Sequence, residues 1–271
     1  FIGAIAIWGI KQSALIIMLI TMIEVVGLLY VVSVAADSMS FPSGMLQRAD
    51  AVGDRLSISG IFLGAFLAFY AYIGFEDMVN VAEEINRPER VLPLAIFLAL
   101  IISTLLYILV SYAALSVLTP KQLALSAAPL ADVVAAKGYP AQWISIISLI
   151  AVINGAIVQL IMASRVIYGM ATKQLLPAGL ARINPHTATP MVATLLCVVV
   201  TLLLALLFPL ASLAQATSLI VLAIFVLVNI ALIRLNGAEV VAGKFHCWSW
   251  VPYVGACLCA AMLLLKFFSY L

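Results

Sequence analysis

Two neighbouring acids follow directly on a long apolar run, and they are the first candidates for chemistry in this sequence. Glu76 and Asp77 come immediately after the run 58–75, and Gly74 stands two residues before Glu76. A charge at membrane depth costs roughly 2.5–3.5 kcal/mol on insertion scales, so such an acid needs a partner, a cavity or a proton. An acid beside a glycine in such a segment therefore indicates a polar pathway through a membrane protein.

A third acid, Glu24, lies in the middle of the apolar segment 13–35. A structural hydrogen bond to a neighbouring helix would account for it, and so would a proton or cation site. Because acids at mid-depth are functional by default, we expect a proton or cation site.

Amides and aromatic residues add to the candidate set. Asn154 and Gln159 lie in the segment 141–171, and both are predicted to face the interior of a helix bundle because an unpaired amide in hydrocarbon is costly. Hydrogen bonds between helices alone would account for them equally well. Tyr70, Tyr72 and Phe75 flank Gly74, and two roles are open for them, which are packing and closure over a ligand.

The acids after Gly74 also have a helical spacing. Glu76, Asn80, Glu83 and Glu84 stand at positions i, i+4, i+7 and i+8, which predicts one face of an α-helix. Glu76 is the deepest of the four and is the better site candidate, whereas Glu83 and Glu84 are typical of a solvated end.

Catalytic and metal-binding patterns do not accompany these residues. The sequence contains no HExxH, GxSxG or Walker A motif, and its two histidines, His186 and His246, lie in polar links. The four cysteines form no paired CxxC set with histidines, so no zinc site is predicted. The net charge of +2 predicts no basic surface for nucleic acid. We expect neither an enzyme nor a bound cofactor.

The elements that must position the candidate residues are membrane helices. Hydrophobic residues make up 66% of the chain and charged residues 9%, against roughly 45–50% and 25% in soluble domains. A spanning helix needs about 20 mostly apolar residues. We therefore predict an all-α, multi-pass integral membrane protein, located in the cell (plasma or inner) membrane, that forms a single transmembrane domain. Its predicted spans are 13–35, 57–82, 91–118, 141–171, 190–208, 211–235 and 251–271.

Two features of these spans bear on the site. The runs 57–82 and 141–171 exceed one crossing, which indicates tilt, extension beyond the bilayer, or a helix broken at mid-depth. Gly74, with the preceding Tyr72 and Ile73, is the first candidate for a break. Pro93 is predicted to lie in the first turn of its helix, where its missing N–H is not needed, and 119–140 is predicted to be a longer loop with some helical character.

The sequence GFEDMVNVAEEINRPERVLPLAI, residues 74–96, resembles the signature of amino-acid permeases in the amino acid–polyamine–organocation superfamily. GIKQSA at 9–14 and ASRVIYGM at 163–170 resemble further family segments, so the resemblance extends over nearly the whole chain. It implies a secondary transporter of two inverted five-helix repeats. Segment 13–35 would then be the fifth helix, 57–82 the sixth and 251–271 the eleventh. The first four helices would lie outside this chain, which alone is not expected to transport.

The resemblance also implies roles for individual residues. The broken sixth helix would offer backbone carbonyls near residues 70–73 to a substrate ammonium group, and Gln159 would lie on the substrate side of the eighth helix. Glu76 matches an acid that some relatives use in gating or proton linkage, and Asn154 falls near a sodium ligand of fold relatives. Glu24 stands where some relatives carry a lysine. The implied substrate-binding set is Tyr70, Ala71, Tyr72, Ile73, Gly74, Phe75 and Gln159, and the implied coupling and gating set is Glu24, Glu76 and Asn154.

The predicted function is secondary active transport of amino acids, or related amines, by alternating access. A proton is the expected coupling ion, with sodium as the alternative. Neutral side chains are expected because no acid beyond Glu76 is placed to meet a second positive charge. Two other functions stay open, which are a non-transporting sensor or partner on the same fold and a channel.

Overall fold

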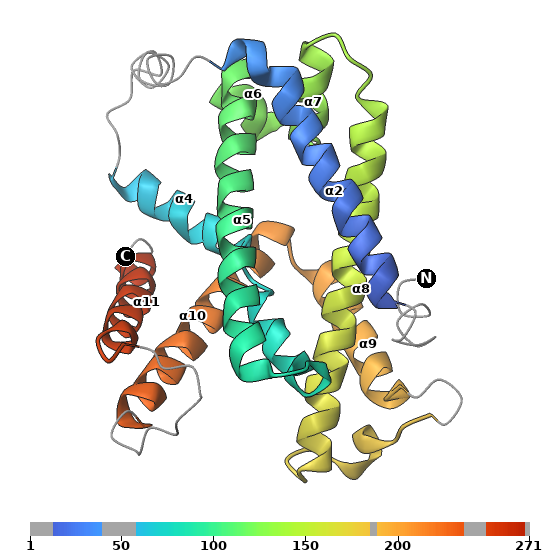
Figure 1. The fold of residues 1–271 in the computed structure, drawn as a ribbon, viewed down its shortest axis with the longest axis vertical. Coiled ribbons are helices and arrows are strands. Elements are labelled where there is room, and N and C mark those ends of the chain that lie inside the picture. Colours follow the sequence, from blue (N-terminus) through green and yellow to red (C-terminus); the bar gives the residue numbers. More distant parts are fainter. Residues whose placement is uncertain (1–12, 40–57, 185–188, 236–247, 269–271) are drawn as a thin grey trace. The chain divides into compact units, whose positions relative to one another are not determined.

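A computed structural model of the chain describes residues 13–39, 58–184, 189–235 and 248–268 (Figure 1). Within these residues the regular elements are helices, with no β-strand among them, and the predicted all-α fold class is confirmed. The chain divides into two compact units, one formed by residues 1–53 and 101–201 and the other by residues 54–100 and 202–271.

The first unit is built around two long helices, α2 (Ser13–Ala35) and α8 (Gln142–Thr172), which lie side by side in Figure 1. A one-turn helix, η1 (Ala36–Ser38), extends α2. The unit also holds η3 (Ala178–Ala181), most of α9 (Met191–Leu207) and the second part of α5 (Pro88–Val117). Apolar composition along nearly every turn suits helices whose surroundings are lipid and other helices.

The stretch 119–140, predicted as a loop with helical character, contains two short helices, α6 (Pro120–Leu125) and α7 (Pro129–Ala136). Thr119 caps α6 reciprocally with Gln122, because each side chain accepts a hydrogen bond from the backbone N–H of the other residue. Such a capping box satisfies two N–H groups that the first helical turn leaves free. Proline begins both helices, at a position where its missing N–H is not needed.

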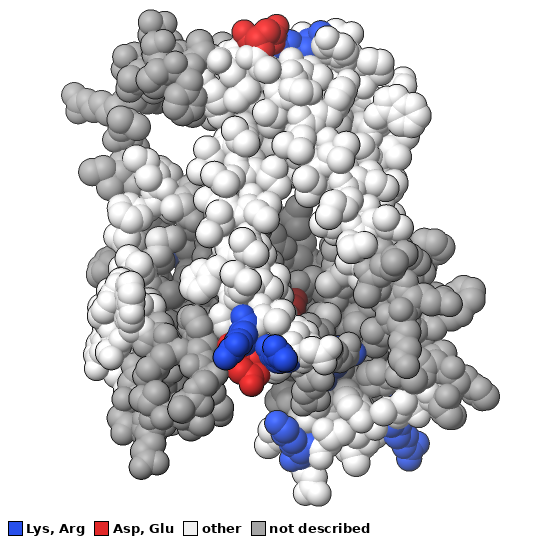
Figure 2. Space-filling model, viewed as in Figure 1, with Lys and Arg blue, Asp and Glu red and all other residues white. Residues whose placement is uncertain are grey.

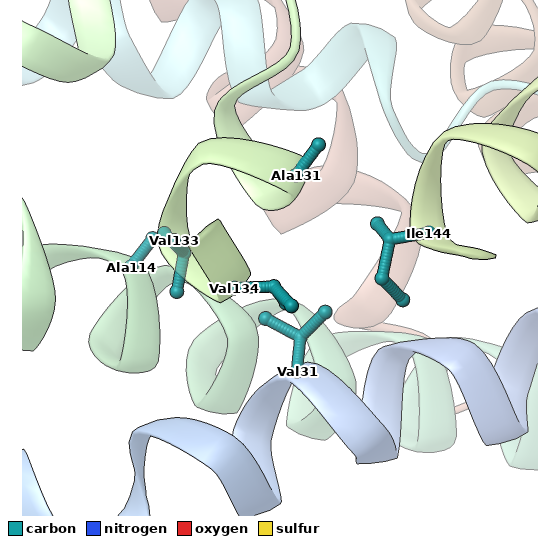
Figure 3. Packing of buried hydrophobic residues seen from close by; sticks show 6 residues of the cluster. All are labelled: Val31, Ala114, Ala131, Val133, Val134 and Ile144. Atoms are coloured by element: carbon teal, nitrogen blue, oxygen red, sulfur yellow. The ribbon is translucent and has the colours of Figure 1, made fainter. Parts of the chain in front are cut away.

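The buried core of the first unit lies where α7 packs against its neighbours. Figure 3 shows Val31 of α2, Val134 of α7 and Ile144 of α8 converging. Ala114 of α5 lies close to α7. An ion pair fastens the end of α7, because Lys137 Nζ lies 2.6 Å from Asp37 Oδ1 and donates to the Ser38 hydroxyl at 2.6 Å. Apolar packing and this ion pair together hold α7 across the ends of α2 and α8.

The second unit contains a helix in two halves and a helix pair. The halves are α4 (Ile58–Tyr70) and the 3₁₀ helix η2 (Phe75–Glu84), and the pair is α10 (Leu210–Leu235) and α11 (Val251–Phe268). Helices α10 and α11 run side by side in Figure 1, and both contact α4. The two helices approach closely at Gly255, where an added Cβ would lie 2.7 Å from Asn229 Oδ1.

Helix α5 begins earlier than the sequence pattern indicated. Its first residue is Pro88, so Pro93 lies inside the helix and not in its first turn. The reason is that Pro88 itself takes the first helical position, for which proline is well suited. Pro93 then lacks the N–H that would bond to the carbonyl four residues earlier.

Five of the described helical stretches are long and apolar enough to cross a membrane, and two further helices, α9 and α11, are apolar but shorter. The five are 17–38, 60–80, 88–117, 142–172 and 210–235. Figure 2 shows the charged side chains of the described residues as small groups among other, white residues. That all seven predicted segments span the bilayer stays a prediction, because 17 residues of helix rise only about 26 Å.

Candidate functional site

The most distinctive feature of the second unit is the interruption between α4 and η2. Helix α4 ends at Tyr70, and residues 71–74 form turns. The N–H groups of Ala71, Tyr72 and Ile73 bond to carbonyls three residues back, at 3.0, 3.0 and 3.2 Å. This tighter pattern ends the α-helix. Gly74 then has a φ of 125°, a conformation that residues with a Cβ rarely adopt, so the break depends on glycine at this position.

Glu76 closes the break from the other side. Its Oε2 accepts a hydrogen bond of 2.8 Å from the Gly74 N–H, and both residues are half-buried. The carboxylate therefore occupies one of the backbone donors that the start of η2 leaves free. The contact links the Glu76 carboxylate to the backbone of the break, and the gating role that the family resemblance implied for Glu76 stays a prediction.

The prediction of an α-helical face after Gly74 is wrong, because this segment is not an α-helix. The ten residues of η2 form a 3₁₀ helix, in which neighbours along one face stand three residues apart. Asn80 Nδ2 consequently donates to Asp77 Oδ1 at 3.3 Å rather than lying on the α-helical face of Glu76.

The predicted substrate-binding residues around the break differ in their surroundings. Tyr70 and Ala71 are exposed, whereas Tyr72, Ile73 and Phe75 are half-buried. The Tyr70 carbonyl accepts the Ile73 N–H, but no donor among the described residues reaches the Ile73 carbonyl. A half-buried carbonyl at the end of a helical half is suited to accept from a cationic group.

Glu24 and Asn154 come together in the first unit. Asn154 Nδ2 donates to Glu24 Oε1 at 3.2 Å, across 130 positions of sequence. Glu24 lies at the middle of the 23-residue α2 and is half-buried, and Asn154 is buried. Glu24 Oε2 accepts no hydrogen bond from the described residues. One amide donor satisfies only part of a carboxylate, which has two acceptor oxygens, so a place remains for a proton or a cation.

A pocket of about 140 Å³ lies beside Glu24. Its walls come from α2, α7 and α8, with Glu24 and Ser148 as its polar lining and Leu28, Leu130 and Ile147 among its apolar lining. Gly27 brings the two long helices close here, since an added Cβ would lie 3.0 Å from Ile147 Cγ2. A space of this size holds several water molecules, and its two polar groups could order them.

Gln159 does not share the environment of Asn154. It is exposed on α8, since five residues turn an α-helix by about 140°. Within the first unit Asn154 is buried and Gln159 is exposed, and that both amides face the interior of the whole bundle stays a prediction. Gln159 belongs to the first unit and the break to the second, so its part in substrate binding stays a prediction.

Sequence reasoning missed two residues in the second unit. Phe225 of α10 contacts the rings of Phe69 and Phe75, and Lys266 is buried with its Nζ 5.3 Å from the centre of the Phe66 ring. No pattern distinguishes Phe225 from the other apolar residues of its segment. A lysine in a spanning segment was a usable signal, because intramembrane charges mark interior positions.

A family model matches this chain along nearly its whole length, and individual known proteins match parts of it. Residues 1–270 match a family model described as amino acid permease. A branched-chain amino acid permease of Bacillus subtilis, BcaP, is 34% identical over 185 residues, which are 67% of this chain and 39% of that protein. The vacuolar cationic amino acid transporter 4 of Arabidopsis thaliana is 28% identical over 241 residues, 84% of this chain and 38% of that protein.

A human relative, cationic amino acid transporter 4, is 34% identical over 165 residues, which are 59% of this chain and 26% of that protein. The chain spans about two fifths of the length of the first two of these curated relatives.

Proposed function

Because the chain belongs to the amino acid permease family, we propose that the full-length protein carries amino acids across a membrane by alternating access, with a proton as the coupling ion. The observation that carries the proposal is the interrupted helix. Its turn at 71–74 leaves the Ile73 carbonyl without a donor among the described residues, beside Gly74 with its φ of 125°. Irregular backbone is tolerated at membrane depth where it lines a cavity or is buried in protein.

The substrate we propose is an amino acid with a neutral side chain. The two acids next to the break are both engaged, Glu76 by the Gly74 N–H and Asp77 by Asn80. A second positive charge on the substrate would therefore have to share these two carboxylates with the Gly74 N–H and the Asn80 amide. The Bacillus subtilis relative is named for branched-chain amino acids, which agrees with this choice, whereas the plant and human relatives are named for cationic ones.

The coupling site we propose is the pair Glu24 and Asn154. A carboxyl group can take up or release a proton at mid-depth, and the pocket beside it offers water access. Asn154 holds one oxygen of the carboxyl group and leaves the other for the proton. Sodium, the alternative, would need additional oxygen ligands around the same place.

The membrane in which the protein works belongs to the same proposal. We assign it to the cell membrane, plasma or inner. The name of the Arabidopsis relative refers to the vacuole, so localisation of the tagged full-length protein decides between these compartments.

A ligand screen tests the substrate assignment. Purified full-length protein in detergent is heated with a panel of neutral amino acids, lysine, arginine and a polyamine, and the melting temperature is recorded. Leucine, isoleucine or valine should raise the melting temperature in a concentration-dependent way, because a ligand stabilises the state that binds it. A shift with lysine and arginine alone would contradict the neutral assignment, and no shift with any ligand would contradict the function.

A further inference from the structure

One aromatic residue of α10 touches both sides of the helix break. The ring of Phe225 lies 6.1 Å from that of Phe69, in an edge-on arrangement at 86°. It also lies 5.7 Å from the ring of Phe75, tilted by 50°. Phe69 is the penultimate residue of α4 and Phe75 is the first of η2. Both ring distances are in the range of favourable aromatic pairs.

The backbone that carries Phe225 is itself fixed. Asn229 Nδ2 donates to the Phe225 carbonyl at 2.8 Å, and Asn229 Oδ1 lies against α11 at Gly255. Helix α11 in turn meets α4 one turn before the break, where Lys266 covers the ring of Phe66. Phe225 thus projects from a packed helix pair and not from an isolated helix.

A continuous helix sets the direction of its two ends through its own hydrogen bonds, and an interrupted helix loses that constraint. The angle between α4 and η2 then depends on contacts with other elements. From this geometry we infer that Phe225 is a positioning residue, which holds the two halves of the broken helix at one angle and so fixes the backbone carbonyls of the turn 71–74. The inference rests on the proposed function for its effect on substrate binding.

The experiment uses the full-length protein with leucine as the probe. Phe225→Leu removes the ring but keeps an apolar side chain, and Phe225→Tyr keeps the ring. Phe62→Leu is the matched control, because Phe62 is an exposed residue of the same α4 helix. Hydrogen exchange of the amides of residues 71–75, followed by mass spectrometry, reports the break directly. Leucine Kd reports its consequence.

We expect Phe225→Leu to speed exchange at 71–75 and to weaken leucine binding, each by about tenfold, as the loss of two aromatic pairs allows. Phe225→Tyr and Phe62→Leu should stay within about twofold of wild type. If Phe225→Leu does not fold, Phe225→Met keeps more of the volume without the ring and replaces it. A merely structural role predicts lower thermal stability with unchanged Kd and unchanged exchange at 71–75, and that result would overturn the inference.

The two measurements, hydrogen exchange at residues 71–75 and leucine Kd, test the role of Phe225 and the proposed function separately. If wild-type protein binds no amino acid, the proposed function fails, and exchange at 71–75 still decides whether Phe225 holds the break. If wild-type protein binds leucine and Phe225→Leu changes neither exchange nor Kd, the function stands and the role of Phe225 is wrong.

Discussion

Glu24 and Asn154 are the two residues on which the proposed coupling depends, and their side chains form a hydrogen bond at the middle of α2. Neither is easily left unpaired at membrane depth, because a buried amide or carboxyl group without a partner loses its hydrogen bonds to water. Their bond of 3.2 Å serves both residues at once. A structural role and a coupling role can therefore be separated by choosing substitutions that keep or remove the bond.

Glu24→Gln should leave the stability of the full-length protein close to wild type, because glutamine offers the same carbonyl acceptor to Asn154. Glu24→Leu should lower the free energy of unfolding by about 1 kcal/mol, since the buried Asn154 amide then lacks its acceptor. The double variant with Asn154→Leu should recover part of that loss. Thermal denaturation in detergent gives the comparison, and equal losses for Gln and Leu would show that the bond contributes nothing.

At this scale the sequence indicated the candidates and not their partners. Glu24 and Asn154 were both predicted because polar residues are conspicuous in apolar segments. Their contact joins α2 to α8 across 130 positions, and no local pattern encodes such a separation. Gln159 had the same polar signal as Asn154 but lies on another side of the helix, so residue type alone could not distinguish them.

Among the elements, the interrupted helix and the helix pair α10 and α11 matter most. The interruption needs Gly74 in a conformation with φ near 125°, and the helix pair needs Gly255 at a close approach. The two glycines are required for different physical reasons. At Gly74 a residue with a Cβ would be strained, and at Gly255 a Cβ would have no space. Two alanine substitutions test these reasons separately.

Gly74→Ala should weaken leucine binding strongly, because the strained conformation costs a residue with a Cβ on the order of 1–3 kcal/mol. The break would relax and change the direction of the neighbouring carbonyls. Isothermal titration of the full-length protein measures the effect. Gly64→Ala is the control within α4, the helix that precedes the break, since its added Cβ meets nothing within 4 Å. Unchanged binding by Gly74→Ala would mean that the turn does not form part of the site.

Gly255→Ala should destabilise the pair by about 1 kcal/mol. The new Cβ would lie 2.7 Å from Asn229 Oδ1, so the Asn229 side chain must move and give up its bond to the Phe225 carbonyl. Combining it with Asn229→Ala removes the clash, so Gly255→Ala should add little further loss in that background. The melting temperatures of wild type, the two single variants and the double variant form a double-mutant cycle. Strictly additive losses of stability would refute the contact between Gly255 and Asn229.

The elements themselves were predictable where apolar runs are long, because burial in lipid demands a helix. The segment predicted at 141–171 forms a helix at Gln142–Thr172, and the break was predicted at Gly74. The 3₁₀ form of η2 was not, since Glu76, Asn80, Glu83 and Glu84 fit an α-helical face equally well. The earlier start of α5 could not be predicted either, because Pro88 and Pro93 are equally suited to a first helical turn by local propensity.

The whole molecule is an integral membrane protein of the amino acid permease family, and its proposed activity depends on both compact units. The break lies in one unit, and Glu24 and Asn154 lie in the other. A carboxyl group in one unit can drive substrate movement at the other only if protonation biases a change of state that the two share. Transport coupled to a pH gradient therefore requires the break, Glu24 and Asn154 together.

The decisive measurement is leucine uptake by the full-length protein in proteoliposomes, with and without an imposed pH gradient, for wild type and Glu24→Gln. We predict that wild-type uptake saturates with leucine and rises with an inward proton gradient. Glu24→Gln should bind leucine with nearly unchanged Kd, because its bond to Asn154 is kept, but its uptake should not respond to the gradient. An equal response of both proteins to the gradient would contradict the assignment of Glu24 as the coupling residue.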